Sequence, residues 1–176
     1  MKLKAIILAL ALSLPALGGI AWANTGLQNT PYSTNTFSAV FNGMVDAGAA
    51  SRSTDGKSTN YTYVSTNTDG TIAQGIIVRF VDYDISVDYT SSDFYANDDT
   101  SAGTIGNRST GTYQGHPFTY TARFSVDNGV NYIKRTRYII VNAREVIFIV
   151  QYAPDTNNSY GDRDQWMDFE DSLTIK

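Results

Sequence analysis

The sequence predicts an α+β fold, in which a β-rich antiparallel sheet is covered by helices. Residues 132–141 and 146–152 are two β-rich runs around a four-residue polar connection, the pattern of a long hairpin. The core of the second run, Val-Ile-Phe-Ile-Val, lacks polar alternation, so we expect both of its faces to be buried. An amphipathic helix is expected at residues 159–172, because Trp166, Phe169 and Leu173 share one face there. A buried strand and an apolar helix face together favour helices packed on the sheet.

The first 23 residues have the pattern of an export signal peptide. Two lysines precede an apolar run at residues 5–14, and Ala21-Trp22-Ala23 is a small-x-small cleavage site. We therefore expect a mature chain that begins at Asn24, is periplasmic or extracellular, and has no integral membrane span after cleavage. The sequence contains no cysteine, so it has no lipobox for a lipid anchor.

Composition favours a single exported domain with a polar surface. After cleavage 11 basic and 17 acidic residues remain, a net charge of about −6, which argues against nucleic acid as a partner. Aspartate, asparagine, threonine, serine and tyrosine are abundant, and these residues favour turns and strands over helices. We expect residues 24–35 to be a flexible lead-in and residues 36–176 to form one domain.

The first half of the domain is expected to be strands and loops. Residues 36–41 alternate as a strand, and residues 42–60 are a loop rich in small and polar residues with an edge segment near residues 48–52. Residues 61–65 and 71–83 are strands joined by a turn that contains Asp69-Gly70.

The second half continues as strands after a weakly patterned segment. Residues 92–97 could begin a short helix, but the residues that follow are poor helix formers. Residues 118–126 alternate as a strand that leads into the long hairpin, and a short strand follows the helix at the end of the chain.

Several hydrophobic patterns resemble those of the PsbP-like family, small exported domains related in fold to the extrinsic PsbP subunit of photosystem II. They are the strand at 36–41, Gln114-Gly115-His116-Pro117, Arg135-x-Arg137-Tyr138, Arg144-x-Val146-x-Phe148 and Trp166-x-x-Phe169-x-x-Ser172-Leu173. The resemblance covers nearly the whole mature chain and implies a helix-covered antiparallel sheet with a non-enzymatic, partner-binding role. The chain departs from it at residues 92–106, where such proteins carry a longer amphipathic helix.

The sequence carries no complete catalytic motif. His116 is the single histidine and stands between Gly115 and Pro117, where a turn residue is expected. With no cysteine, no GxSxG, no HExxH and no Walker A loop, we predict a non-enzymatic protein without a cofactor.

The sequence also allows two alternative functions. Asp82 and Asp84 lie two residues apart, and paired carboxylates can support the acid–base chemistry of a secreted hydrolase. A carbohydrate-binding β-module could instead present an aromatic platform made by six tyrosines: Tyr61, Tyr63, Tyr113, Tyr120, Tyr132 and Tyr138.

Two sets of residues are candidate binding sites. Asp155, Asn157 and Asp162 could form a loose calcium site, although Tyr160 and Trp166 stand where an EF-hand needs glycine and glutamate. A basic cluster in this acidic protein could bind an anionic ligand or pair with aspartates; its members are Lys134, Arg135 and Arg137. The expected partner is an unidentified protein or small ligand.

Overall fold

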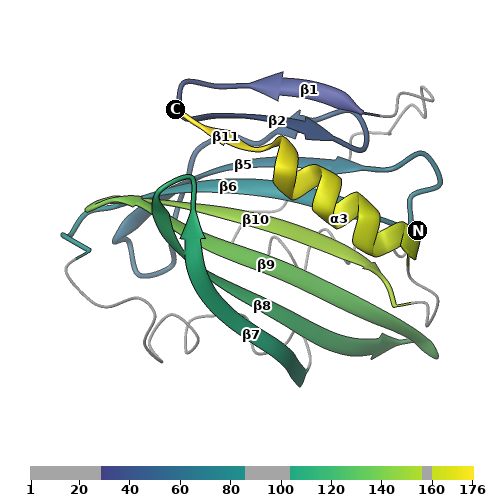
Figure 1. Ribbon diagram of the computed structural model, residues 1–176. Coiled ribbons are helices and arrows are strands. Elements are labelled where there is room, and N and C mark those ends of the chain that lie inside the picture. The colour runs from purple at the N-terminus through teal and green to yellow at the C-terminus, as the bar shows by residue number, and fades with distance from the viewer. Residues whose placement is uncertain (1–28, 86–103, 156–159) are drawn as a thin grey trace.

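The computed structural model describes residues 29–85, 104–155 and 160–176 (Figure 1). Its strands are β1 (Thr30–Ser33), β2 (Phe37–Phe41), β3 (Asp46–Ala47), β4 (Ser51–Arg52), β5 (Ser58–Thr66), β6 (Ala73–Val81), β7 (Thr104–Tyr113), β8 (His116–Asp127), β9 (Val130–Asn142), β10 (Glu145–Pro154) and β11 (Thr174–Ile175). One helix, α3 (Tyr160–Ser172), lies within these residues.

The larger sheet is antiparallel throughout and runs in the order β3-β5-β6-β10-β9-β8-β7, with β4 also paired to β5. Tight hairpins connect β7, β8, β9 and β10. Gln114 and Gly115 both have positive φ angles, as do Asn128 and Gly129, and two such residues in succession form the turn that matches strand twist. The predicted long hairpin is confirmed as β9 and β10, with a register shift at Glu145/Val146 beside its turn.

The α+β prediction of a helix-covered sheet is wrong. In the described part of the chain the fold is mostly β, and α3 covers only part of one sheet face. The sequence predicted that helices would cover the buried strand, which is β10. Much of that cover is a second, three-stranded sheet in the order β1-β2-β11. The segment at residues 92–97, expected to begin a helix, lies outside the described residues, as does most of 92–106.

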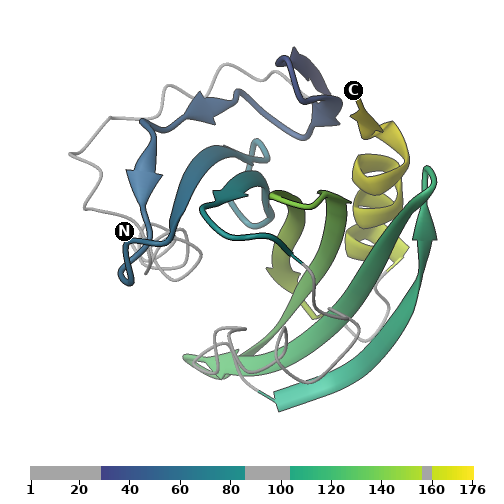
Figure 2. The ribbon, with the colours of Figure 1, turned by 90° about the vertical axis from the view of Figure 1, so that its left-hand side faces the viewer.

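The main core lies between the concave face of the large sheet and the layer made by α3 and the small sheet (Figures 1 and 2). Phe37 and Phe41 of β2 are fully buried, and Phe41 packs against Phe169 of α3 with ring centroids 5.0 Å apart. Figure 2 shows the large sheet curving so that α3 lies inside the curve.

Strand β1 lies within the segment that the sequence predicts to be a lead-in. It pairs with β2 because Tyr32 can reach the aromatic cluster beneath it, where its ring lies 5.5 Å from that of Tyr63 and 6.2 Å from that of Phe41. The sequence did not predict this strand or its aromatic contacts.

Both faces of β10 are buried, as its unbroken apolar run predicts. Ile147 and Ile149 belong to the main core, whereas Val146, Phe148 and Val150 form a separate cluster on the opposite face. In the described part of the chain, no helix has the length and apolar character that crossing a membrane requires.

Candidate functional site

The basic cluster is divided between the two sheet faces. Arg137 of β9 points toward α3, forms an ion pair with Glu170, and lies over the ring of Phe118 at 4.0 Å from its centroid. Arg135 lies on the same face, buried beside Tyr120, whereas Lys134 takes the opposite face by strand alternation. The structure therefore does not bring the three cations together as one surface, and Arg137 binds the protein's own carboxylate.

The carboxyl group of Glu170 is mostly removed from water. Burial raises its pKa above the ordinary value, while the neighbouring Arg137 opposes that change. Beside this pair, the hydroxyl of Tyr113 donates hydrogen bonds to the main-chain oxygens of Glu170 and Leu173 at 2.5 and 3.0 Å. The β7–β8 hairpin thus holds the C-terminal end of α3 against the sheet.

We expect Glu170→Gln to change how the stability of the protein depends on pH. A carboxyl group whose pKa is raised by folding contributes stability below its unfolded pKa and loses that contribution as pH rises through the folded pKa. The stability of the wild type relative to Glu170→Gln should therefore fall as pH rises from the ordinary range of a glutamate through the raised pKa of Glu170. Urea unfolding at a series of pH values measures this difference. A difference that grows with pH would mean that the attraction of Arg137 outweighs burial.

The two candidate catalytic carboxylates are engaged separately. Asp82 accepts a hydrogen bond from Arg52 at 2.6 Å, and this bond holds the pKa of Asp82 below its usual range. Asp84 pairs instead with Arg144 at 2.8 Å. Both carboxylates follow the end of β6 and are exposed. A lowered pKa is the opposite of what a general acid needs at neutral pH.

The calcium candidates are only partly described. The backbone N–H of Asp155 donates to the main-chain oxygen of Asn131 at 2.7 Å. Asn157 lies outside the described residues, and the side chain of Asp162, at the start of α3, is also outside them. Among the residues that the structure does describe, no three acidic or histidine side chains are grouped as metal ligands.

The tyrosines are dispersed and do not form one platform. Tyr63 packs against Phe37, Tyr120 against Trp166, and Tyr138 against Phe148 in the cluster on the other face. Tyr132 stacks on Tyr152 with ring centroids 4.9 Å apart. His116, which the sequence predicts to be a turn residue, is instead the first residue of β8, directly after the Gln114-Gly115 turn.

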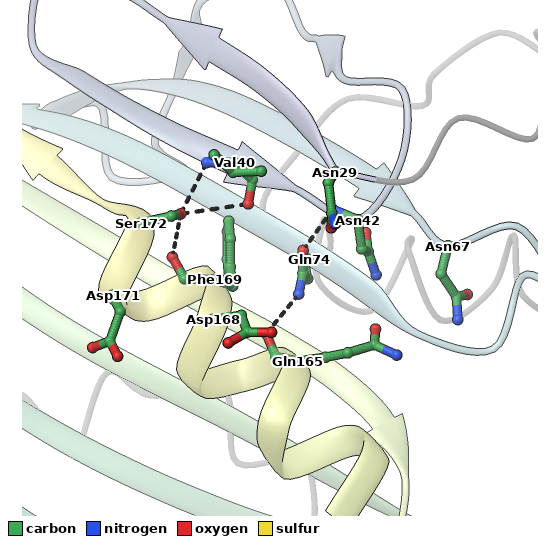
Figure 3. Close-up of a pocket in the computed structure, with 10 residues that line it drawn as sticks. All are labelled: Asn29, Val40, Asn42, Asn67, Gln74, Gln165, Asp168, Phe169, Asp171 and Ser172. Atoms are coloured by element: carbon green, nitrogen blue, oxygen red, sulfur yellow. Dashed lines mark hydrogen bonds between the residues drawn. The ribbon is translucent and has the colours of Figure 1, made fainter.

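A cavity of about 650 Å³, which the sequence did not predict, lies beside α3. Figure 3 shows its lining, which comes from the residue before β1, the end of β2, the start of β6, the β5–β6 connection and one side of the helix. Most of the lining is polar: Asn29, Asn42, Asn67, Gln74, Gln165, Asp168, Asp171 and Ser172, with Val40 and Phe169 as its apolar members.

A hydrogen-bond network centred on Gln74 holds the inner end of the cavity. The Oε1 atom of Gln74 accepts from the backbone N–H of Asn42 at 2.9 Å. Its Nε2 atom donates to Gln151 Oε1 at 3.0 Å and to the main-chain oxygen of Gln165 at 3.2 Å. One side chain therefore ties β2, β10 and α3 together, which fixes the distance between the helix and the sheet.

Gln165 carries a polar atom without a partner. Its Oε1 atom is buried and accepts no hydrogen bond within the described residues. A buried acceptor in this state costs roughly 1–3 kcal/mol, so it favours the entry of a donor. Figure 3 shows the Gln165 side chain extending along the cavity from α3.

One signal in the sequence could have located this site. Gln74 and Gln151 are polar residues at buried positions of mostly apolar strands, and the two are direct partners across β6 and β10. A buried amide needs hydrogen-bond partners, so such a pair marks a place where the core is polar. The contribution of α3 required knowledge of how the helix docks.

Comparisons with known proteins identify no family. No family model matches the chain, and no curated protein matches it in sequence. Among solved structures, one that is similar is LpqN, described as involved in cell envelope biogenesis of Mycobacterium tuberculosis. The two chains share 12% sequence identity with a TM-score of 0.48, and the match covers 85% of this chain and 91% of that one. A likeness at this level says nothing about function.

Proposed function

We propose that this protein is an exported, non-enzymatic domain that binds a small polar molecule in the cavity beside α3. The observation that carries the proposal is the cavity itself, whose volume of about 650 Å³ lies within the range of small-molecule sites in proteins. Its polar lining and the unpartnered Gln165 oxygen supply groups that a ligand can satisfy. Export rests on the signal-peptide pattern of the first 23 residues.

The chemistry of the lining favours binding over catalysis. The hydroxyl of Ser172 donates to the main-chain oxygen of Phe169 at 2.7 Å and accepts from the N–H of Val40 at 2.9 Å, so it is held as a structural group. Asp171 points away from Gln74 toward the outer edge, which leaves Asp168 without a facing carboxylate (Figure 3). The lining therefore offers no activated nucleophile and no opposed acid pair.

The other functions predicted from the sequence receive less support. A hydrolase that uses Asp82 and Asp84 would need carboxylates released from their arginine partners. An aromatic carbohydrate platform would need tyrosines gathered on one surface. The resemblance to the PsbP-like family remains a prediction, and the binding role that it implies agrees with the proposal, with a small ligand in place of a protein partner.

A plug in the cavity tests the proposal. Asp168→Trp places a large side chain in the lining, and Asp164→Trp, one helical turn earlier and outside the lining, is the matched control. Ligand-observed NMR is recorded with glucosamine, ethanolamine, putrescine and their neutral counterparts glucose, ethylene glycol and 1,4-butanediol. We expect saturable binding of at least one probe that is lost in Asp168→Trp and kept in Asp164→Trp. Absence of binding, or binding that survives the plug, overturns the proposal.

A further inference from the structure

We infer that the ligand of this cavity is a small organic cation that carries a primary ammonium group. The inference rests on the proposed function and narrows it to a chemical class. It follows from which hydrogen-bonding groups of the lining are already used and which remain.

The donors at the inner end of the cavity are engaged by the protein. The Nδ2 atom of Asn42 donates to the main-chain oxygen of Ile72 at 3.2 Å, and the Nε2 atom of Gln74 donates to two oxygens. The Nδ2 atom of Asn67 donates to the hydroxyl of Thr71 at 3.3 Å. Gln74 therefore has no side-chain N–H left to offer a ligand, and Asn42 and Asn67 have one each, so the inner end of the cavity offers few donors to a phosphate or carboxylate.

The groups that remain include an amide oxygen and a carboxylate. Gln165 lines the cavity, and its Oε1 atom has no donor among the described residues. Asp168 lies next along the same side of α3 and adds a full negative charge. An ammonium group has three donors and no acceptor, so it matches an amide oxygen beside a carboxylate.

The charges around the cavity also favour a cationic ligand. The ten lining residues include two aspartates and no lysine, arginine or histidine. The mature chain is also acidic overall, which favours the approach of cations over anions. A ligand with hydroxyl groups in addition to its ammonium group would use the remaining oxygen atoms around the mouth.

Pairs of cationic and neutral probes of similar size show whether the cavity recognises the charge of a ligand or only its shape. Glucosamine, ethanolamine and putrescine are each titrated at pH 6.5 beside a neutral counterpart of similar size, namely glucose, ethylene glycol and 1,4-butanediol. We expect at least one cation to bind about tenfold or more tightly than its counterpart, and this preference to weaken as salt is added.

Substitutions of Asp168 and Gln165 test whether these two residues cause the preference for cations. Asp168→Asn should weaken binding of the preferred cation about tenfold, whereas Asp164→Asn, the charge-matched control outside the lining, should change it less than about threefold. Gln165→Glu, which replaces the unpartnered oxygen by a carboxylate, should strengthen cation binding. Its main-chain oxygen, which accepts from Gln74, is unchanged by the substitution.

The outcomes distinguish this inference from the proposed function. If neutral probes bind as well as the cations and the plug variant Asp168→Trp still blocks them, the cavity is a binding site but the cation assignment is wrong. If Asp168→Asn and Asp164→Asn weaken a cation equally, the preference comes from the overall charge of the protein and the assignment is also wrong. If no probe binds, both proposals fall.

Discussion

Replacing Ile147 with aspartate is expected to abolish soluble expression. Ile147 is fully buried at the centre of β10, directly opposite Val78 on β6 and Ile139 on β9. A carboxylate there would lose its hydration without gaining a cationic partner, which costs several kcal/mol against a total stability of about 5–15 kcal/mol. Expression in soluble form, followed by circular dichroism of any soluble fraction, measures the outcome.

The conservative variant Ile147→Val separates the loss of packing from the burial of charge. It should remain soluble and lose only about 0.5–1.5 kcal/mol. If Ile147→Asp folds with normal stability, this side of β10 is open to water and the layer formed by α3 and the small sheet does not seal the core.

Trp166→Ala is expected to lower the free energy of unfolding by about 3–5 kcal/mol. Trp166 is 4% exposed, belongs to the main core, and packs against Tyr120 with ring centroids 6.0 Å apart. Truncation would leave a void that cannot close readily, because Gln74 and Tyr113 hold α3 at a fixed distance from the sheet. Urea denaturation followed by circular dichroism measures the change.

Trp166→Phe serves as the control, since it keeps an aromatic ring and should lose much less stability than Trp166→Ala. A denaturation midpoint for Trp166→Ala that equals the wild-type value would place α3 outside the folded core. Protease resistance of residues 160–172 in the two variants gives an independent measure of whether the helix stays docked.

The strands were predictable because their signals are local. Alternation in residues 36–41 and 118–126 and the long hairpin around residues 142–145 each depend on neighbours in the chain, and all three appear in the structure. The amphipathic pattern of α3 was equally local and is also present. Apolar periodicity therefore located most of the described elements.

What covers the buried strand was not predictable in the same way. The unbroken apolar run of β10 demands a cover on each face but does not specify whether a helix or a strand supplies it. The small sheet forms through the pairing of β2 with β11, segments separated by more than a hundred residues. A short strand is expected after the helix, but the two residues of β11 carry no signal that identifies β2 as their partner.

The cavity escaped prediction for a related reason. Its lining joins β2, β6 and α3, and each lining residue taken alone resembles an ordinary polar residue of a turn or an exposed helix face. Only Gln74 was recognisable in principle, because an amide within an apolar strand has to find hydrogen-bond partners. Which hydrogen-bonding groups of the lining remain for a ligand depends on the contacts that the folded chain makes.

The hydrogen bond from Val40 N–H to the Ser172 hydroxyl spans 132 positions of sequence. Phe37 and Phe41 precede every strand of the large sheet, yet the helix that buries them follows all of those strands. Hairpins such as β9–β10 can close early, because little chain entropy is lost in joining near neighbours. The aromatic side of the core must instead wait until residues 160–175 are present. In the export proposed above, a chain still emerging from a translocation channel would therefore keep its first strands unpacked.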